Sequence, residues 1–133
     1  MNKNILSIET TSDICSVALF SNQKLISIKE DSNRNHSSLL ALFVDEIFKE
    51  SYISLCSLDA IALSIGPGSY TGLRIGCSFA KGIAYSLSKP IIPINTIDSL
   101  NYSINDSNYF IALSAYKDYF FIQEYSNGKK INK

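Results

Sequence analysis

The stretch from Ile65 to Gly76 constrains the fold of this chain more than any other part of the sequence. The apolar, partly β-branched run before it, Asp59 to Ile65, predicts a buried strand. The Gly-Pro-Gly sequence at 66–68 cannot continue that strand, because proline lacks an N–H group and glycine permits positive φ. Ser69 and Thr71 both suit the N-cap of a long helix. The unpaired N–H groups of such a turn attract anions or carboxylates. The residues of this glycine loop are Gly66, Pro67, Gly68, Ser69, Tyr70, Thr71, Gly72 and Arg74.

Small residues recur at every fourth position of the predicted helix and form one narrow stripe: Gly72, Gly76, Ala80 and Ala84. A glycine inside a helix costs about 1 kcal/mol relative to alanine, so two glycines on one stripe need a physical reason. The stripe allows another backbone to approach closely, either from this chain's own core or from a second chain. Larger apolar residues lie at other angles around the helix. Whichever of these two surfaces the stripe does not contact, the core or a second chain, would be contacted by these residues: Ile75, Phe79, Ile83 and Leu87.

Three familiar glycine motifs do not fit this stretch. A triphosphate-binding loop needs a lysine followed by serine or threonine after its last glycine, and Leu73 follows Gly72 here. The dinucleotide fingerprint fails by one residue, since Gly68 and Gly72 are four apart. A nucleophile elbow fails because Ser69 directly follows Gly68.

The composition limits the class of protein. A chain of 133 residues suits one domain with at most a partial second one. Twelve basic and twelve acidic residues give zero net charge, which argues against independent binding of nucleic acid. Three cysteines, none of them in a C-x-x-C pair, predict small core residues of a reduced cytoplasmic protein. No apolar run approaches about 18 residues, so we expect neither a membrane span nor a signal peptide.

Short β-branched runs and periodic apolar patterns predict the remaining elements. They are the strands Ile5–Ile8, Cys15–Phe20 and Lys24–Lys29, a helix at about Ser38–Glu50, the strand Ile91–Ile94, a short helix capped by Thr96, and a hairpin of Tyr109–Ser114 and Tyr119–Tyr125. Pro93 places its strand at a sheet edge, and Asn127-Gly128 predicts a turn into a further strand.

The first predicted helix is apolar over more than half of its circumference, which indicates two packing partners. Its apolar residues are Leu39, Leu40, Leu42, Phe43, Val44, Ile47 and Phe48. One partner would be the sheet, and the other the helix after the glycine loop, a second chain, or both.

The order β-β-β-α-β-α-β-α predicts an α/β fold, with a mixed five-stranded sheet and helices on its faces. This is the pattern of one lobe of the actin, Hsp70 and sugar-kinase fold, which is ribonuclease H-like. We expect residues 1–105 to form this first lobe. Residues 106–133 would form the hairpin that begins an incomplete second lobe.

Four segments together resemble the TsaB (YeaZ) family: Ile8-Glu9-Thr10, Cys15 to Leu19, Asn35-His36-Ser37 and, most specifically, Gly66 to Gly76. The resemblance runs from Ile5 to about Asp98 and continues thinly to Gly128. It implies a cytoplasmic, catalytically silent scaffold subunit of the bacterial machinery that makes threonylcarbamoyladenosine next to the anticodon of tRNA. Its implied partners are TsaD, which carries the metal and the chemistry, and the ATPase TsaE. Members of the family can also pair with themselves, so the resemblance allows a homodimer, and it implies that tRNA is met only through the complex.

In that family the partner surface lies on the two helices of the first lobe. Carried over to this chain, the interface would comprise Leu39, Leu40, Phe43, Ile47, Gly72, Gly76, Phe79, Ala80 and Ile83. The resemblance implies no tightly bound cofactor, and ATP or ADP would bind only at the interface of the complex.

Two enzymatic hypotheses compete with the scaffold. A small ATPase or phosphotransferase would use a vestigial nucleotide site at Glu9, Thr10, Thr11 and Asp13, where kinases of this fold hold phosphate and metal. A serine peptidase would need Ser69 as nucleophile and His36, the single histidine, as base. We expect no metal site, because one histidine falls short of three or four converging ligands. His36 is more simply a hydrogen-bonding residue at the helix entry.

Overall fold

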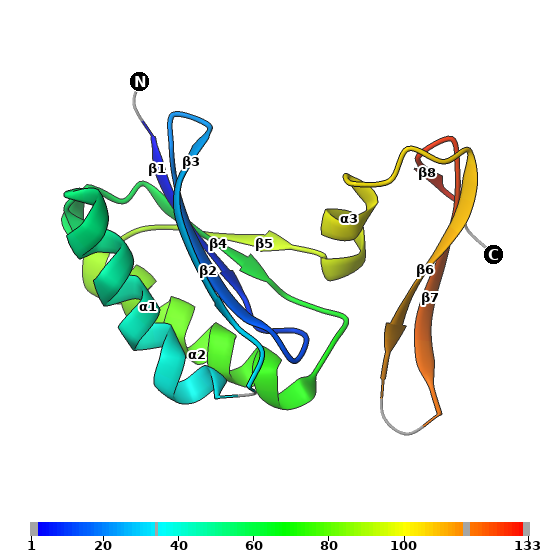
Figure 1. Cartoon of the computed structure of the whole chain (residues 1–133), viewed down its shortest axis with the longest axis horizontal. Helices are drawn as coiled ribbons and strands as arrows, with labels where there is room; N and C mark the ends of the chain where they lie inside the picture. Colours follow the sequence, from blue (N-terminus) through cyan, green and yellow to red (C-terminus); the bar gives the residue numbers. More distant parts are fainter. Residues whose placement is uncertain (1–2, 34, 116–117, 132–133) are drawn as a thin grey trace.

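The computed structural model describes residues 3–33, 35–115 and 118–131. Its first lobe is built on a five-stranded sheet with the strand order β3-β2-β1-β4-β5 (Figure 1). The strands β1 (Asn4–Glu9), β2 (Cys15–Ser21) and β3 (Lys24–Asp31) form an antiparallel meander. β4 (Ala60–Ser64) pairs with β1 in parallel, and β5 (Ile91–Ile94) pairs with β4 in parallel. The predicted mixed five-stranded sheet is confirmed.

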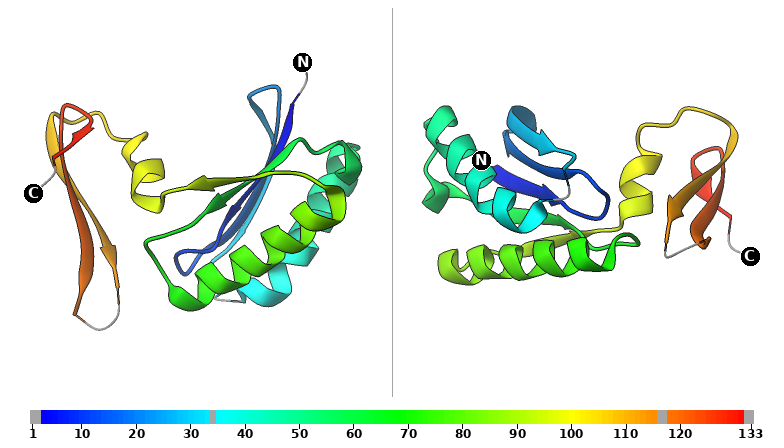
Figure 2. Two further views of the ribbon diagram at one scale, coloured as in Figure 1. Left: turned by 180° about the vertical axis from the view of Figure 1, so that it is seen from behind. Right: turned by 60° about the horizontal axis from the view of Figure 1, so that its bottom comes forward.

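The two long helices, α1 (His36–Ser51) and α2 (Tyr70–Leu87), lie side by side on one face of this sheet (Figures 1 and 2). A short 3₁₀ turn, η1 (Leu55–Ser57), leads from α1 to β4. Alternate strand residues such as Leu6, Val17 and Ile61 point towards the helices and join them in one buried core. The sequence predicted helices on the faces of the sheet, and the structure places both long ones on the same face.

The second lobe is a three-stranded antiparallel sheet in the order β6-β7-β8. Its strands are β6 (Asn108–Ser114), β7 (Phe120–Ser126) and the short β8 (Lys129–Lys130). The predicted hairpin is confirmed, and so is the turn at Asn127-Gly128, where both residues have positive φ. Figure 2 shows this sheet standing apart from the first one, joined to it through α3 (Thr96–Asn101).

The short helix α3 packs against the second sheet. Ile97 shares a small core with Ile111 and Tyr125. The hydroxyl of Tyr125 donates to a carboxylate oxygen of Asp98 (3.3 Å), and Lys130 forms an ion pair with the same oxygen (2.6 Å). The sequence placed the boundary between the lobes at residue 105. That boundary stays a prediction, and the structure adds that α3 packs against the second sheet.

The capping residues show how the local sequence sets where the helices begin. Ser69 is the N-cap of α2 and its hydroxyl accepts from the N–H group of Gly72 (3.3 Å), as the sequence suggested. The prediction for α3 was wrong by one residue. The side chain of Asn95 accepts from the N–H group of Asp98 (3.1 Å), and Thr96 is the first helical residue.

Burial separates the three cysteines. Cys15 is buried on β2, Cys77 on α2 is half-buried, and Cys56 is exposed. The prediction of a core residue was therefore wrong for Cys56, which lies in the exposed turn η1. None of the helices in the described part of the chain is both long and apolar enough to cross a membrane.

Candidate functional site

The glycine loop and the turn after β1 are joined by hydrogen bonds at the carboxyl ends of β1 and β4. The buried hydroxyl of Thr10 donates to the carbonyl of Gly72 (2.8 Å). The N–H group of Ser69 donates to the carbonyl of Thr11 (2.7 Å). On the other side of the loop, the N–H group of Thr96 donates to the carbonyl of Gly66 (2.9 Å). The loop is thereby bonded both to the turn after β1 and to the first residue of α3.

The small-residue stripe of α2 faces this same turn. A Cβ atom added at Gly72 would overlap the carbonyl oxygen of Thr10, and one added at Gly76 would overlap the hydroxyl of Thr10. Ala80 and Ala84 continue the stripe and are buried in the core of the first lobe. Of the two interpretations of the stripe, the structure selects packing against this chain's own sheet.

This packing also changes the interpretation of the loop as an anion-binding turn. The N–H group of Ser69 is bonded to Thr11, and that of Gly72 to the Ser69 hydroxyl. The N–H group of Leu73 donates to the carbonyl of Ser69 (2.8 Å). The prediction of a turn of unpaired donors was therefore wrong for these three groups.

A cleft of about 1100 Å³ lies between the two lobes. From the first lobe its lining includes Glu9, Thr11 and Asp13 of the predicted vestigial nucleotide site. Thr10, the fourth residue of that site, is buried beneath α2 and does not line the cleft. Its inclusion was wrong, because its hydroxyl is committed to Gly72. The carboxylate of Glu9 accepts from both the N–H group and the hydroxyl of Thr11.

Sequence reasoning missed several residues that α3 and the second sheet contribute to the cleft. Ser99 and Leu100 come from α3, Leu113 from β6 and Phe121 from β7. No local pattern marks these residues, since their position depends on how the two sheets are joined. The hydroxyl of Thr96 is buried nearby without a partner among the described residues.

His36 begins α1 and is buried at 6% exposure. Its Nε2 donates to the carbonyl of Ser12 (2.8 Å), which ties the start of the helix to the turn after β1. The predicted role as a hydrogen-bonding residue at the helix entry is confirmed. Ser69, the nucleophile of the peptidase hypothesis, caps α2: its Oγ accepts from the N–H group of Gly72.

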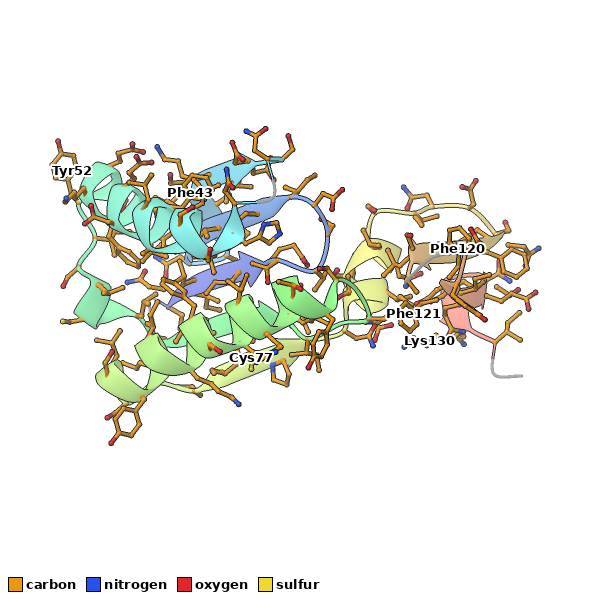
Figure 3. The ribbon with its side chains drawn as sticks, turned by 90° about the horizontal axis from the view of Figure 1, so that it is seen from below. Phe43, Tyr52, Cys77, Phe120, Phe121 and Lys130 are labelled. Carbon is orange, nitrogen blue, oxygen red and sulfur yellow. The ribbon has the colours of Figure 1, made fainter. Side chains whose placement is uncertain are left out.

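Most of the predicted interface residues lie inside the first lobe. Six are buried in the chain's own packing: Leu40, Phe43, Ile47, Gly72, Gly76 and Ala80. Assigning them to a free surface was wrong, because their side chains or bare Cα atoms already contact the sheet. Figure 3 shows Phe43 on α1 and Cys77 on the neighbouring α2. Leu39, Phe79 and Ile83 are only partly buried. Leu42 (47% exposed) and Tyr85 (91% exposed) add apolar area on the same helices.

Two buried acids carry raised pKa values. Burial, with a smaller effect from the Asp31 carboxylate, raises the pKa of Cys15 to about 11, so its thiol is protonated and a poor nucleophile at neutral pH. Burial, followed by the charge of Asp98, raises the pKa of Tyr125.

Comparisons with known proteins agree with this fold and these motifs. The family model described as "TsaD: tRNA N6-adenosine threonylcarbamoyltransferase" matches residues 23–132. Among curated proteins, the "tRNA threonylcarbamoyladenosine biosynthesis protein TsaB" of Haemophilus influenzae is 35% identical over 99 residues, which is 74% of this chain and 42% of that protein. The protein of the same name from Escherichia coli is 37% identical over 93 residues, 70% of this chain and 40% of that protein.

A solved structure described as "YeaZ from Pseudomonas aeruginosa" superimposes with a TM-score of 0.83 at 24% identity, covering 97% of this chain and 63% of that one. The fold is thus that of an actin-like lobe with the beginning of a second. The chain belongs to the family whose model is described as TsaD, tRNA N6-adenosine threonylcarbamoyltransferase, and it is similar to proteins named TsaB. It spans less than half the length of the curated TsaB proteins it matches.

Proposed function

We propose that this chain is a non-catalytic subunit that binds TsaD in the machinery that makes threonylcarbamoyladenosine in tRNA. The observation that carries the proposal is that the glycine motif, the most specific motif of the chain, is used for internal packing. The glycines at 72 and 76 seat α2 on Thr10, and the donors of the loop are largely spent on the chain's own carbonyls. The motif therefore builds a rigid helix pair rather than a reaction centre.

The proposed docking surface is the outward side of α1 and α2. It comprises the partly buried Leu39, Phe79 and Ile83 together with the exposed Leu42 and Tyr85. Apolar side chains that remain exposed on rigidly packed helices are suited to burial against another protein. In this proposal TsaE joins through the complex, tRNA is met only indirectly, and any ATP or ADP binds at the interface of the complex.

The test is co-expression with the TsaD of the same organism, followed by size-exclusion chromatography and calorimetry. We expect Leu42→Glu combined with Tyr85→Glu to weaken binding at least tenfold, because the two charges would have to be desolvated at the interface. The matched control is Ile28→Glu, since Ile28 is also 47% exposed but lies on β3. Equal binding by the double variant and the wild type would rule out this surface. Failure of the wild type to bind TsaD would rule out the function.

The inter-lobe cleft favours a second candidate function, a small ATPase or phosphotransferase. Its volume admits a nucleotide, and Glu9 and Asp13 lie in its lining. Calorimetry with ATP and magnesium tests this candidate directly. Micromolar binding with turnover that is lost in Glu9→Gln would replace the scaffold proposal. Heat changes no larger than those of the buffer would leave the scaffold standing.

A further inference from the structure

The helix α2 contains three glycines, and the packing of the chain accounts for two of them. Gly72 and Gly76 are needed because Thr10 lies where a Cβ atom would go. At Gly82 nothing lies within 4 Å of an added Cβ atom, and the residue is exposed in the second half of the helix. A glycine inside a helix costs about 1 kcal/mol relative to alanine. The contacts of the described chain give no reason for this cost at Gly82.

Gly82 lies between two aromatic residues of the docking surface proposed above. On a helix, the residues three and four positions away are neighbours. For Gly82 these neighbours include Phe79 and Tyr85, together with the exposed Ser78 and Ser86. Two large rings therefore flank a position without a side chain. The backbone of another protein can approach the axis of α2 more closely at Gly82 than over either ring.

The acidic residues of the neighbouring helix α1 form ion pairs within the chain. Asp45 pairs with Lys49 (2.6 Å). Glu46 and Glu50 both pair with Lys29 of β3, at 3.4 Å and 2.6 Å. Because each of these carboxylates already faces a lysine, α1 does not require a basic surface on a partner.

The charges of α2 are different, since the helix has no acidic residue and carries Arg74 and Lys81. The two residues are seven positions apart and lie on the same side of the helix. The guanidinium of Arg74 lies over the ring of Tyr70, 5.6 Å from its centroid. Among the residues that the structure describes, neither Arg74 nor Lys81 forms an ion pair. An acidic surface on a partner would neutralise both charges.

These charges favour a different protein over a second copy of this chain. If α2 crossed α2 of another copy at Gly82, Lys81 of both copies would lie close together, and α2 has no acidic residue to oppose them. Like charges that face each other disfavour such a pair. The helix α1 of another copy is no better suited, because its carboxylates already pair with lysines.

We propose that an acidic helix of TsaD crosses α2 at Gly82 and places a carboxylate beside Lys81. This inference rests on the proposed function and adds to it the point of closest contact and the charge of the partner helix. The missing side chain lets the two helices approach each other, and the rings of Phe79 and Tyr85 pack on either side of the crossing. Gly82 then destabilises the free chain and strengthens the complex.

Stability and binding should respond in opposite directions to one added methyl group. Gly82→Ala is expected to raise the urea midpoint of the free chain, because alanine favours the helix. It should also raise the dissociation constant for TsaD about tenfold, because the new Cβ atom separates the helices. Calorimetry with TsaD of the same organism measures this constant, and Gly82→Leu should weaken binding further. The matched control is Ala112→Leu at an exposed alanine on β6, which is expected to bind like the wild type.

A second pair of variants tests the charge at the crossing. Lys81→Gln and Lys49→Gln each remove one exposed lysine from a helix. We expect Lys81→Gln to raise the dissociation constant about threefold and to reduce its dependence on salt concentration, because a carboxylate of the partner loses its counterpart. Lys49→Gln should change neither quantity, since Lys49 pairs with Asp45 of its own chain.

The outcomes separate this inference from the proposed function. If the wild type binds TsaD and both Gly82 variants bind equally well, the crossing at Gly82 is wrong and the scaffold function stands. An unchanged dependence on salt in Lys81→Gln would overturn the acidic partner helix. Self-association of the wild type that is lost in Gly82→Leu would assign the crossing to a second copy. No binding of TsaD by the wild type would overturn both the inference and the function.

Discussion

The two lobes begin with the same three-stranded meander and differ in what covers it. In the first lobe, β1 gains β4 at its open side, and α1 and α2 cover one face, so that fifteen residues form one buried core. In the second lobe, β6 keeps an open edge, α3 is six residues long, and the buried core has three members. A meander alone is marginal in water. The difference teaches that the stability of this supersecondary unit comes from its neighbours.

In the first lobe, the backbone of Gly72 lies directly against Thr10. We expect the largest loss of stability from a substitution at this contact. Gly72→Ala places a Cβ on the carbonyl of Thr10 and should cost about 4 kcal/mol or more, measured by urea denaturation. The control is Gly82→Ala, where nothing lies within 4 Å of the added Cβ. It should stabilise α2 by about 0.5–1 kcal/mol. Similar effects of the two substitutions would show that the close approach is not needed.

In the second lobe, we expect a core substitution to cause local unfolding only. Tyr125→Ala removes a fully buried ring that stacks on Tyr109 with centroids 5.3 Å apart. We expect a loss of roughly 3 kcal/mol of local stability, seen as faster amide exchange in β6 and β7 with β1 and β4 unchanged. Tyr102→Ala, at a 91% exposed ring, is the control and should have no effect. Equal loss of protection in β1 would mean that both lobes unfold as one unit.

The smallest expected effect is a loss of stability at alkaline pH, which should begin at a lower pH in the first lobe than in the second. The pKa of Cys15 is raised from 9.0 to about 11, so below pH 9 its contribution to stability is complete. As the pH rises from 9 to 11 the unfolded chain releases the proton while the folded chain retains it, and stability falls. The wild type should lose about 2 kcal/mol more than Cys15→Ala over this range.

The exposed thiol of Cys56 supplies the control for this measurement. Cys56→Ala should follow the wild type across the whole range of pH, because its thiol lies outside the core. The pKa of Tyr125 is also raised, from 10.0, so the second lobe should begin to lose stability only above about pH 10. Parallel pH curves for Cys15→Ala and the wild type would show that the thiol does not contribute.

Much of the fold could be predicted from residue patterns, because the patterns are local. Alternating apolar residues set the strands, Ser69 set the start of α2, and Pro93 set an edge. The candidate interface was predicted less well. An apolar residue on a helix looks the same in sequence whether it faces a core or a partner, and six of nine proved to be buried. The cleft depends on residues from α3, β6 and β7 that no motif connects.

The sequence by itself determined the element order, the turn chemistry and the glycine motif that places the chain in its family. Only the tertiary structure decided that the small stripe faces Thr10, that both long helices share one face, and that α3 packs against the second sheet. The physical reason is the distance along the chain over which the interactions act. Caps, turns and periodicity act over a few residues, whereas burial and strand neighbours depend on segments that meet across fifty or more residues, as Thr10 meets Gly72.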